Sequence, residues 1–266
     1  MKKQLFFITL LLLTAFACAQ KKPIKVACVG NSITYGYGIE NREQNSYPSV
    51  LQRQLGKSYE VENFGHSGAT LLSKGHKPYI QQEEYKKALA FAADIVVIHL
   101  GINDTDPRNW PNYRDDFVKD YLSLIASFKK ANPKARILIA RMTPLAHRHK
   151  RFESGTRDWH AEIQQAIERI AKQAGVQLID FHEPLYHFPQ MLPDAVHPNV
   201  QGAAILAQVV YSAITGDYGG LHLPAIYSDN MVLQHGIPLT LGGIANTGTK
   251  ITVKIDKQQL TTTADS

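Results

Sequence analysis

The sequence has little cysteine: of its 266 residues, only Cys18 and Cys28 carry thiols. Two thiols are too few for the disulfide frameworks of small secreted domains or for a zinc site built from several thiolates. Cys28 lies inside an apolar run, so we expect it to be a small buried side chain. A hydrophobic core rather than cross-links is therefore expected to hold the fold together.

Long runs of like charge are also missing. The chain carries 29 Lys and Arg against 23 Asp and Glu, a formal net charge of +6, and no long lysine run. Its densest basic patch, residues 147–151, is short, and we interpret it as a solvated loop face. No basic stripe interleaved with aromatic residues favours nucleic acid as a partner. With 44% hydrophobic and 20% charged residues, the composition is that of a globular domain with a sizeable core.

Apolar runs long enough to span a membrane are absent as well. The longest, residues 5–16, is short for a bilayer and follows two lysines at the N-terminus. Small residues come next, so residues 1–19 are predicted to be a signal peptide, cleaved after Ala17 or Ala19. Cleavage after Ala17, which is the bond before Cys18, would leave a cysteine that can carry a lipid anchor. The mature protein is thus expected to be secreted or periplasmic, without a membrane span.

After this segment, strand-like and helix-like stretches alternate. Apolar runs without clean alternation predict buried strands over residues 24–29, 59–63, 95–100, 136–140 and 176–180. Helical spacing predicts helices over residues 47–55, 85–92, 113–130, 157–175 and 200–215. Gly175 suits a helix C-terminus and Asn199 a helix N-cap. The alternation predicts a doubly wound α/β fold with a parallel sheet.

Two short motifs at opposite ends of this region carry reactive groups. Gly-Asn-Ser-Ile-Thr-Tyr-Gly at residues 30–36 places Ser32 where the first strand stops. Pro-Asp-Ala-Val-His-Pro at residues 193–198 places Asp194 and His197 three residues apart, close enough to share a hydrogen bond if the backbone turns. A hydroxyl nucleophile, an imidazole base and an orienting carboxylate are the three groups of a serine hydrolase.

Two further blocks follow the second and third expected strands. Residues 61–70 read Val-Glu-Asn-Phe-Gly-His-Ser-Gly-Ala-Thr, and residues 101–104 read Gly-Ile-Asn-Asp. All four blocks fall at the carboxyl ends of expected parallel strands or just before the last helix. Ligands of open α/β sheets gather at that edge.

With these four blocks in this order, residues 24–215 resemble the SGNH (GDSL-type) hydrolases. The resemblance implies a three-layer α/β/α domain with a five-stranded parallel sheet. It also implies the site residues: Ser32 as nucleophile, His197 as general base, Asp194 as its partner, and the Ser32 N–H, the Gly68 N–H and the Asn103 amide as the oxyanion hole. The sequence departs from the family at Asn31, where an aspartate is usual; that residue supports the turn in the family.

The composition shifts after Thr215. Residues 216–220 read as a linker, and residues 221–266 are β-rich, with an alternating strand at residues 251–255. The stretch Leu-Pro…Ser-Asp-Asn-Met-Val-Leu-Gln resembles the start of the β-domain of sialate O-acetylesterases. This resemblance implies the truncated opening of a second, β-rich domain, and a first domain over residues 20–215.

Together, the two resemblances predict a secreted esterase that removes O-acetyl groups from a carbohydrate, sialic acid first, with no metal or cofactor. A lipid or short-chain acyl esterase of the lysophospholipase or thioesterase type is the alternative. A nucleotide-binding domain would need a G-x-G-x-x-G or Walker A motif, which the first turn lacks. A metal hydrolase using His147, His149 and His160 would need carboxylate partners that their loop lacks at ligand spacing. A non-catalytic carbohydrate-binding module is the third rival, to be separated by a covalent serine probe.

Overall fold

The structure is a computed structural model that describes residues 22–150, 155–224, 226–227, 231–232, 234 and 236–265. The predicted signal peptide, residues 1–19, and its Cys18 lie outside the described residues, as does part of the stretch that resembles sialate O-acetylesterases. The proposed division into domains at residues 215–221 stays a prediction.

A five-stranded parallel sheet with strand order β2-β1-β3-β4-β5 forms the centre of the molecule. Its strands are β1 (Ile24–Gly30), β2 (Tyr59–Gly65), β3 (Ile95–His99), β4 (Arg136–Arg141) and β5 (Gln177–Asp180). Gly30 pairs with Gly65 on one side and His99 on the other, so three strands end level with one another. Every residue of β3 is buried, as expected of a strand covered on both faces.

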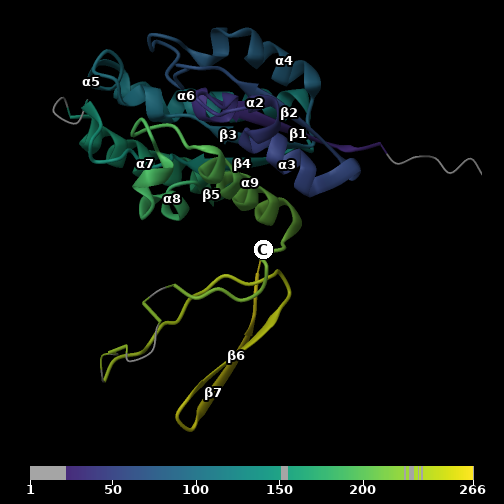
Figure 1. Ribbon diagram of the computed structural model, residues 1–266, viewed down its shortest axis with the longest axis vertical. Coiled ribbons are helices and arrows are strands. Elements are labelled where there is room, and N and C mark those ends of the chain that lie inside the picture. Colours follow the sequence, from purple (N-terminus) through teal and green to yellow (C-terminus); the bar gives the residue numbers. More distant parts are fainter. Residues whose placement is uncertain are drawn as a thin grey trace, which may run out of the picture.

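Helices cover both faces of the sheet (Figure 1). On one face α3 (Tyr47–Leu55) packs against α9 (Val200–Thr215), and on the other lie α4 (Glu83–Phe91), α6 (Phe117–Ala131) and α7 (Thr156–Ala174). The predicted α/β/α arrangement with five parallel strands is confirmed. The predicted helix ends hold too: Gly175 ends α7 in the left-handed region (φ 60°), and the Asn199 side chain accepts a hydrogen bond from the Gly202 N–H at 2.9 Å.

Short helices occupy the connections, and one of them corrects the sequence prediction. The short α-helices are α1 (Ser32–Tyr35), α2 (Arg42–Asn45), α5 (Trp110–Tyr113) and α8 (Glu183–Tyr186). Single 3₁₀ turns lie at Gly56–Ser58, Tyr79–Gln81, Ile102–Thr105, Arg114–Asp116 and Pro189–Met191. The helix predicted over residues 113–130 begins only at Phe117, as α6, because Tyr113 leaves the helical region (φ −132°, ψ 10°) and a 3₁₀ turn separates α5 from α6.

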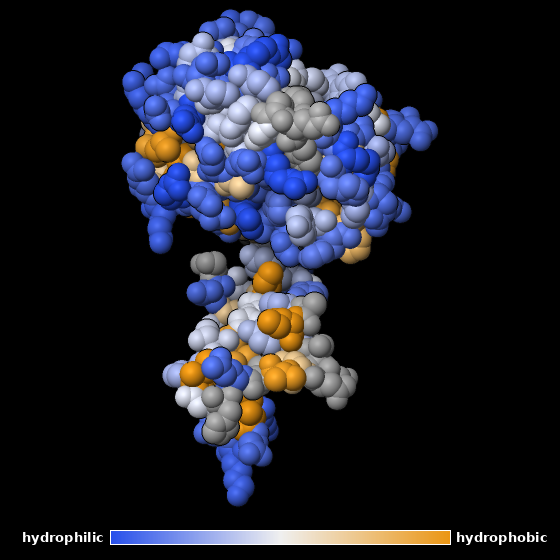
Figure 2. Space-filling view, turned by 90° about the vertical axis from the view of Figure 1, so that its left-hand side faces the viewer, coloured by the Kyte–Doolittle hydropathy of each residue, from blue (hydrophilic) through white to orange (hydrophobic). Residues whose placement is uncertain are grey.

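The C-terminal segment is a separate, thin structure below the sheet in Figure 1. Strands β6 (Lys250–Ile255) and β7 (Gln258–Thr263) form an antiparallel two-stranded ribbon. Apolar side chains lie exposed on this part of the molecule, as Figure 2 shows, among them Val232 and Leu260. Among the described residues, no helix combines the length and the apolar character that crossing a bilayer requires.

Candidate active site

The turn after β1 places one hydroxyl, that of the buried Ser32, at the edge of the sheet. A Cβ on Gly30 would lie 2.7 Å from the His99 carbonyl oxygen, so only glycine lets β1 end this close to β3. The Asn31 side chain then accepts a hydrogen bond from the Ile33 N–H at 3.0 Å and caps α1. Ser32 is the first residue of that helix. Asn31 therefore supports the turn, as expected for the residue that replaces the usual aspartate.

The structure brings the three predicted reactive groups into one chain of hydrogen bonds. The Ser32 Oγ lies 2.8 Å from the His197 Nε2, although 165 residues separate them in the sequence. The His197 Nδ1 lies 2.6 Å from the Asp194 Oδ2. Since Ser32 comes from the turn after β1 and the other two from the loop before α9, the fold rather than local sequence sets the first distance. We call Ser32, His197 and Asp194 the relay.

A tight turn shapes the Asp194–His197 segment. The Asp194 Oδ1 accepts hydrogen bonds from the backbone N–H groups of Val196 (3.0 Å) and His197 (2.7 Å). Ala195 between them has φ 74°, which costs an L-residue roughly 1–2 kcal/mol. Partial burial opposes ionisation of Asp194, but the hydrogen bonds from His197 and Val196 outweigh it and hold the pKa of this carboxyl below its usual value. Asp194 is therefore a carboxylate at neutral pH.

A neighbouring loop holds this turn in place. The Ala146 N–H donates to the Ala195 carbonyl at 2.9 Å. The Arg148 guanidinium donates to the Leu192 carbonyl and, at 3.3 Å, to that of Pro189. The basic patch at residues 147–151 was expected to be a solvated face. Arg148 is exposed, in keeping with that expectation, and its side chain in addition binds the backbone just before Asp194.

The relay opens into a small cavity of about 220 Å³. Its lining includes four of the five predicted site residues, Ser32, Gly68, Asn103 and His197, while Asp194 lies behind His197. The other lining residues are Tyr37, Ser67, Ile102, Thr105, Leu145, His149 and Val196. The Tyr37 ring, 54% exposed, lies over the His197 ring with centroids 4.7 Å apart. Gly68 lines the cavity, whereas Gly65 ends β2 with its backbone against α1.

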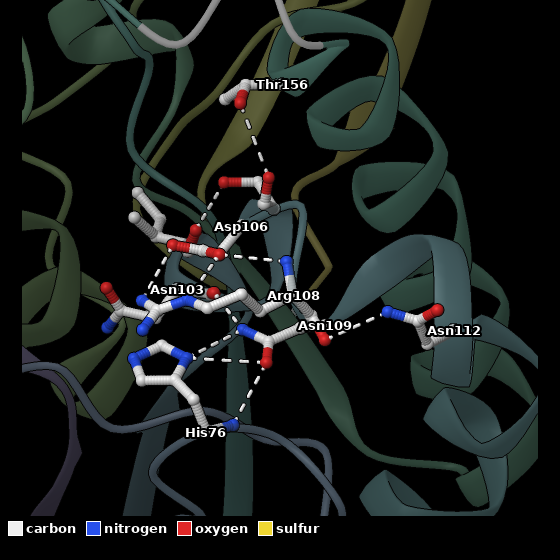
Figure 3. Close-up of polar contacts among 9 residues, drawn as sticks. His76, Asn103, Asp106, Arg108, Asn109, Asn112 and Thr156 are labelled. Atoms are coloured by element: carbon white, nitrogen blue, oxygen red, sulfur yellow. Dashed lines mark hydrogen bonds and ion pairs between the residues drawn. The ribbon is translucent and has the colours of Figure 1, made fainter.

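Asn103 is fixed by a polar network between two loops, drawn in Figure 3. Its side-chain amide donates to the Ala69 carbonyl at 2.9 Å, and its own carbonyl accepts from the Asn109 amide at 2.8 Å. Asn109, fully buried, also accepts from the His76 N–H at 3.0 Å. The loop after β2, which carries Gly68, is thereby tied to the loop after β3, which carries Asn103.

Asp104 adds a second tie between the same loops. Its buried carboxyl accepts hydrogen bonds from the backbone N–H groups of Leu71 (2.9 Å) and Leu72 (2.8 Å). Burial raises the pKa of Asp104 to about 7, although these hydrogen bonds act in the opposite direction. Sequence reasoning missed this residue, despite its place directly after Asn103, because no motif points to a partner more than thirty positions away.

The three histidines of the metal hypothesis do not form one group. His147 is exposed, His149 lines the cavity, and His160 is buried with its Nε2 3.0 Å from the Thr143 carbonyl. Within the described part of the chain, no three His, Cys, Asp or Glu side chains are arranged to hold a metal ion. Desolvation lowers the pKa of His160 to about 4 and that of the fully buried His99 to about 3, so both are neutral packing groups at pH 7.

A curated relative matches most of this chain. An acetylxylan esterase from Xylanibacter ruminicola is 36% identical over 218 residues, which cover 76% of this chain and 45% of that protein. The chain thus spans less than half the length of this curated relative.

Solved structures share the fold at low identity. An inhibitor-bound aryl esterase of M. smegmatis superposes with a TM-score of 0.57 at 17% identity, covering 72% of this chain and 98% of that one. An acetyl xylan esterase, AlAXEase, gives 0.55 at 20% identity, covering 72% and 100%. The model of the GDSL-like Lipase/Acylhydrolase family matches residues 28–205, which include the whole relay. The chain belongs to this family, as its sequence predicts.

Proposed function

We propose that the chain is a serine esterase that removes O-acetyl groups from a carbohydrate. The observation that carries the proposal is the relay itself, with its distances of 2.8 and 2.6 Å, opening into a cavity of about 220 Å³. An acetylxylan esterase as a relative supports the carbohydrate ester.

The relay geometry sets the course of the reaction. Since the Asp194 carboxylate faces Nδ1, the His197 proton lies on that nitrogen and the Nε2 lone pair faces the Ser32 hydroxyl. His197 accepts the hydroxyl proton as Ser32 Oγ attacks the ester carbonyl carbon, and Asp194 stabilises the imidazolium. The imidazolium then protonates the departing sugar oxygen, leaving an acetyl-enzyme. Water, deprotonated by His197, then attacks the carbonyl carbon of the acetyl-enzyme. The imidazolium returns the proton to Ser32 Oγ as acetate leaves.

The negative oxygen of each tetrahedral intermediate must be stabilised by hydrogen-bond donors. We assign the N–H groups of Ser32 and Gly68 and the side-chain amide of Asn103, all of which border the cavity. Asn103 has two amide hydrogens, one of which is used for the Ala69 carbonyl, so the other is free to face the oxyanion. Removing one such donor in comparable sites costs about 2.7–4 kcal/mol.

The size of the cavity favours a short acyl group. A volume of about 220 Å³ must hold the acyl chain and part of the alcohol. Its apolar lining comes from separate side chains, Ile102, Leu145 and Val196, rather than from a continuous apolar groove. Tyr37, exposed above His197, offers an aromatic face on which a sugar ring can pack. These features support an acetylated sugar over the long acyl chain of a lipid.

Two acetylated glycans are each supported by one observation. The stretch in residues 221–234 that resembles sialate O-acetylesterases supports sialic acid, and the relative named acetylxylan esterase supports xylan. Acetate release from O-acetylated sialic acids, acetylxylan and p-nitrophenyl esters of increasing length tests the proposal. We expect acetyl esters to be fastest and one of the two glycans to be deacetylated. A rate that rises with acyl length would instead favour the lipid esterase.

We further propose that the protein acts outside the cytoplasm, in keeping with a polysaccharide substrate. The N-terminal sequence supports this, with its two lysines, its apolar run and its small residues around Cys18. Mass spectrometry of the mature N-terminus tests it. Cleavage after Ala17 or Ala19 is expected, and a lipid on Cys18 would establish the anchored form, whereas an intact Met1 would contradict export.

A further inference from the structure

One peptide group of the cavity wall is held by a cation. The Lys77 ammonium donates a hydrogen bond to the Ser67 carbonyl oxygen at 2.9 Å. That carbonyl belongs to the same planar unit as the Gly68 N–H, since the peptide bond joins the carbon of Ser67 to the nitrogen of Gly68. In a trans peptide the two groups point in opposite directions, so the direction of one fixes that of the other.

We propose that Lys77 is a positioning residue for the oxyanion hole and acts through the Ser67–Gly68 peptide. The inference rests on the proposed function, in which the Gly68 N–H meets the negative oxygen. By holding the carbonyl from outside the cavity, Lys77 keeps the N–H pointing inward. A charge-assisted hydrogen bond to the carbonyl also polarises the peptide, which makes its N–H a stronger donor.

Gly68 needs such a restraint. Its φ of 82° lies in the left-handed region, which glycine enters at little cost but from which it also departs easily. The Lys77 side chain runs beside it, because a Cβ built on Gly68 would lie 3.4 Å from the Lys77 Cδ and 3.9 Å from its Nζ. The lysine therefore packs against the glycine as well as binding its peptide.

The backbone of Lys77 is itself anchored, so its side chain reaches out from a fixed point. The Lys77 carbonyl accepts a hydrogen bond from the Thr70 N–H at 2.8 Å, and the Tyr79 N–H donates to the Thr70 carbonyl at 2.9 Å. The preceding residue, His76, is bound through its N–H to Asn109, as Figure 3 shows. Both ends of the link from Lys77 to Gly68 thus belong to the frame that also holds Asn103.

The chemistry separates this role from others. A negative oxygen forms twice per turnover, once in acylation and once in deacylation, and the same donors meet it each time. Loss of Lys77 should therefore slow both steps by a similar factor. A role in binding the leaving alcohol would affect acylation alone, because the alcohol has left before deacylation begins.

The test uses Lys77→Met, which keeps the length and apolar stem of the side chain but removes its charge and donors. With p-nitrophenyl acetate, the pre-steady-state burst reports acylation and the linear phase deacylation. We expect both rates to fall roughly 10- to 100-fold, less than the 10²–10³ for outright removal of a donor, with KM changed less than about threefold. Lys77→Arg should recover most of the loss, since a guanidinium can also donate to the carbonyl.

Lys74→Met is the matched control. Lys74 lies in the same loop, but its ammonium pairs with Asp116 at 2.9 Å on the surface and its side chain is 63% exposed. This variant should keep wild-type rates. Rates are normalised to active sites titrated with a serine-reactive phosphonate, which separates a slower site from a smaller number of folded sites.

The outcomes distinguish the inference from the function on which it rests. Wild-type rates per site in Lys77→Met, or a fall in acylation alone, would overturn the role of Lys77. A fall in both rates that Lys77→Arg does not recover would also overturn it, since any cationic donor of similar reach should serve. Survival of activity in Ser32→Ala would instead overturn the proposed function. An inactive Ser32→Ala beside an unaffected Lys77→Met would leave the function standing and remove only the inference.

Discussion

The two regions of the molecule contain strands of similar length in opposite surroundings. In the body, residues 24–215, β3 is buried along all five residues. In the C-terminal segment, residues 216–265, β7 is exposed along all six. Helices cover both faces of the central sheet, whereas β6 and β7, among the described residues, pair only with each other. The comparison shows that pairing alone leaves the faces of a strand in solvent and that burial requires covering layers.

The same division separates the site from the segment. The relay lies at the start of α9, next to Asn199, and the segment leaves from its other end at Gly216. Sixteen helical residues span about 24 Å at 1.5 Å per residue. Just beyond Gly216 the segment folds back on itself, because the Asn246 side chain accepts hydrogen bonds from the N–H groups of Tyr218 and Gly220. Changes in the segment should therefore leave catalysis untouched, which the following predictions examine.

The largest effect is expected for Ser32→Ala. Loss of the nucleophile should lower kcat by about 10⁶ without lowering the melting temperature, because the side chain is small and lies at the rim of the core. Turnover of p-nitrophenyl acetate and thermal unfolding measure the two quantities. The control in the segment is Thr261→Ala, which should keep kcat within about twofold. Near-wild-type activity in Ser32→Ala would refute the relay.

Asn103→Ala should have the next largest effect, a fall in kcat of roughly 10²–10³ with a smaller change in KM, because the amide acts on the developing oxyanion. Steady-state kinetics with the same ester measure both constants. Asn112→Ala, on the exposed side of the network in Figure 3, is the control and should match the wild type. A change in KM alone would reassign Asn103 to binding of the substrate ground state.

The buried histidines should make the body sensitive to acid. Burial lowers the pKa of His99 to about 3, whereas an unfolded histidine titrates near 6.5. Below pH 6.5 the unfolded chain therefore binds a proton that the folded chain refuses, and at pH 5 this costs about 2 kcal/mol. His160, with its pKa lowered to about 4, adds a similar loss. Asp104 acts in the opposite direction, since its raised pKa favours the folded chain as the pH falls from 7.

A variant isolates one of these contributions. We expect the loss in unfolding free energy between pH 7 and pH 5 to be about 2 kcal/mol smaller in His99→Phe than in the wild type, measured by urea denaturation. The matching change in the segment, His222→Phe, removes an exposed histidine and should leave the loss unchanged. Equal losses in His99→Phe and the wild type would show that His99 binds a proton in the folded state.

The smallest effect is expected for Leu260→Ala in β7. This side chain is 74% exposed, so its truncation should change the free energy of unfolding by less than about 0.5 kcal/mol. The same substitution at the fully buried Leu138 of β4 should cost about 2–5 kcal/mol. Denaturant melts of both variants compare the two regions directly. A loss above about 1 kcal/mol in Leu260→Ala would mean that the ribbon buries this residue against a partner.

The sequence predicted what depends on local pattern. The strand limits agree with the structure within two residues, because buried parallel strands are continuous apolar runs bounded by polar turns. The predicted Ser32, Asp194 and His197 come together as expected. The break between α5 and α6 was missed, since the apolar spacing continues across it.

The supports of the site were harder to predict. Lys77, Asp104 and Arg148 bind backbone groups that lie 10, 32 and 44 positions away. Such contacts depend on how irregular loops meet in space. The partner in each contact is a backbone group, which a residue of almost any type can supply. The sequence therefore does not single out either member of the pair.

The turn at Asp194 and His197 determines which contacts a movement of its loop would break. Both side chains, and the hydrogen bond between them, lie within four consecutive residues, and the hydrogen bond from His197 Nε2 joins them to Ser32. The carboxylate and the imidazole should therefore move together when this turn moves. A displacement of this loop would break the contact with Ser32 and the hydrogen bonds from Ala146 and Arg148, but it would leave the hydrogen bond between Asp194 and His197 intact.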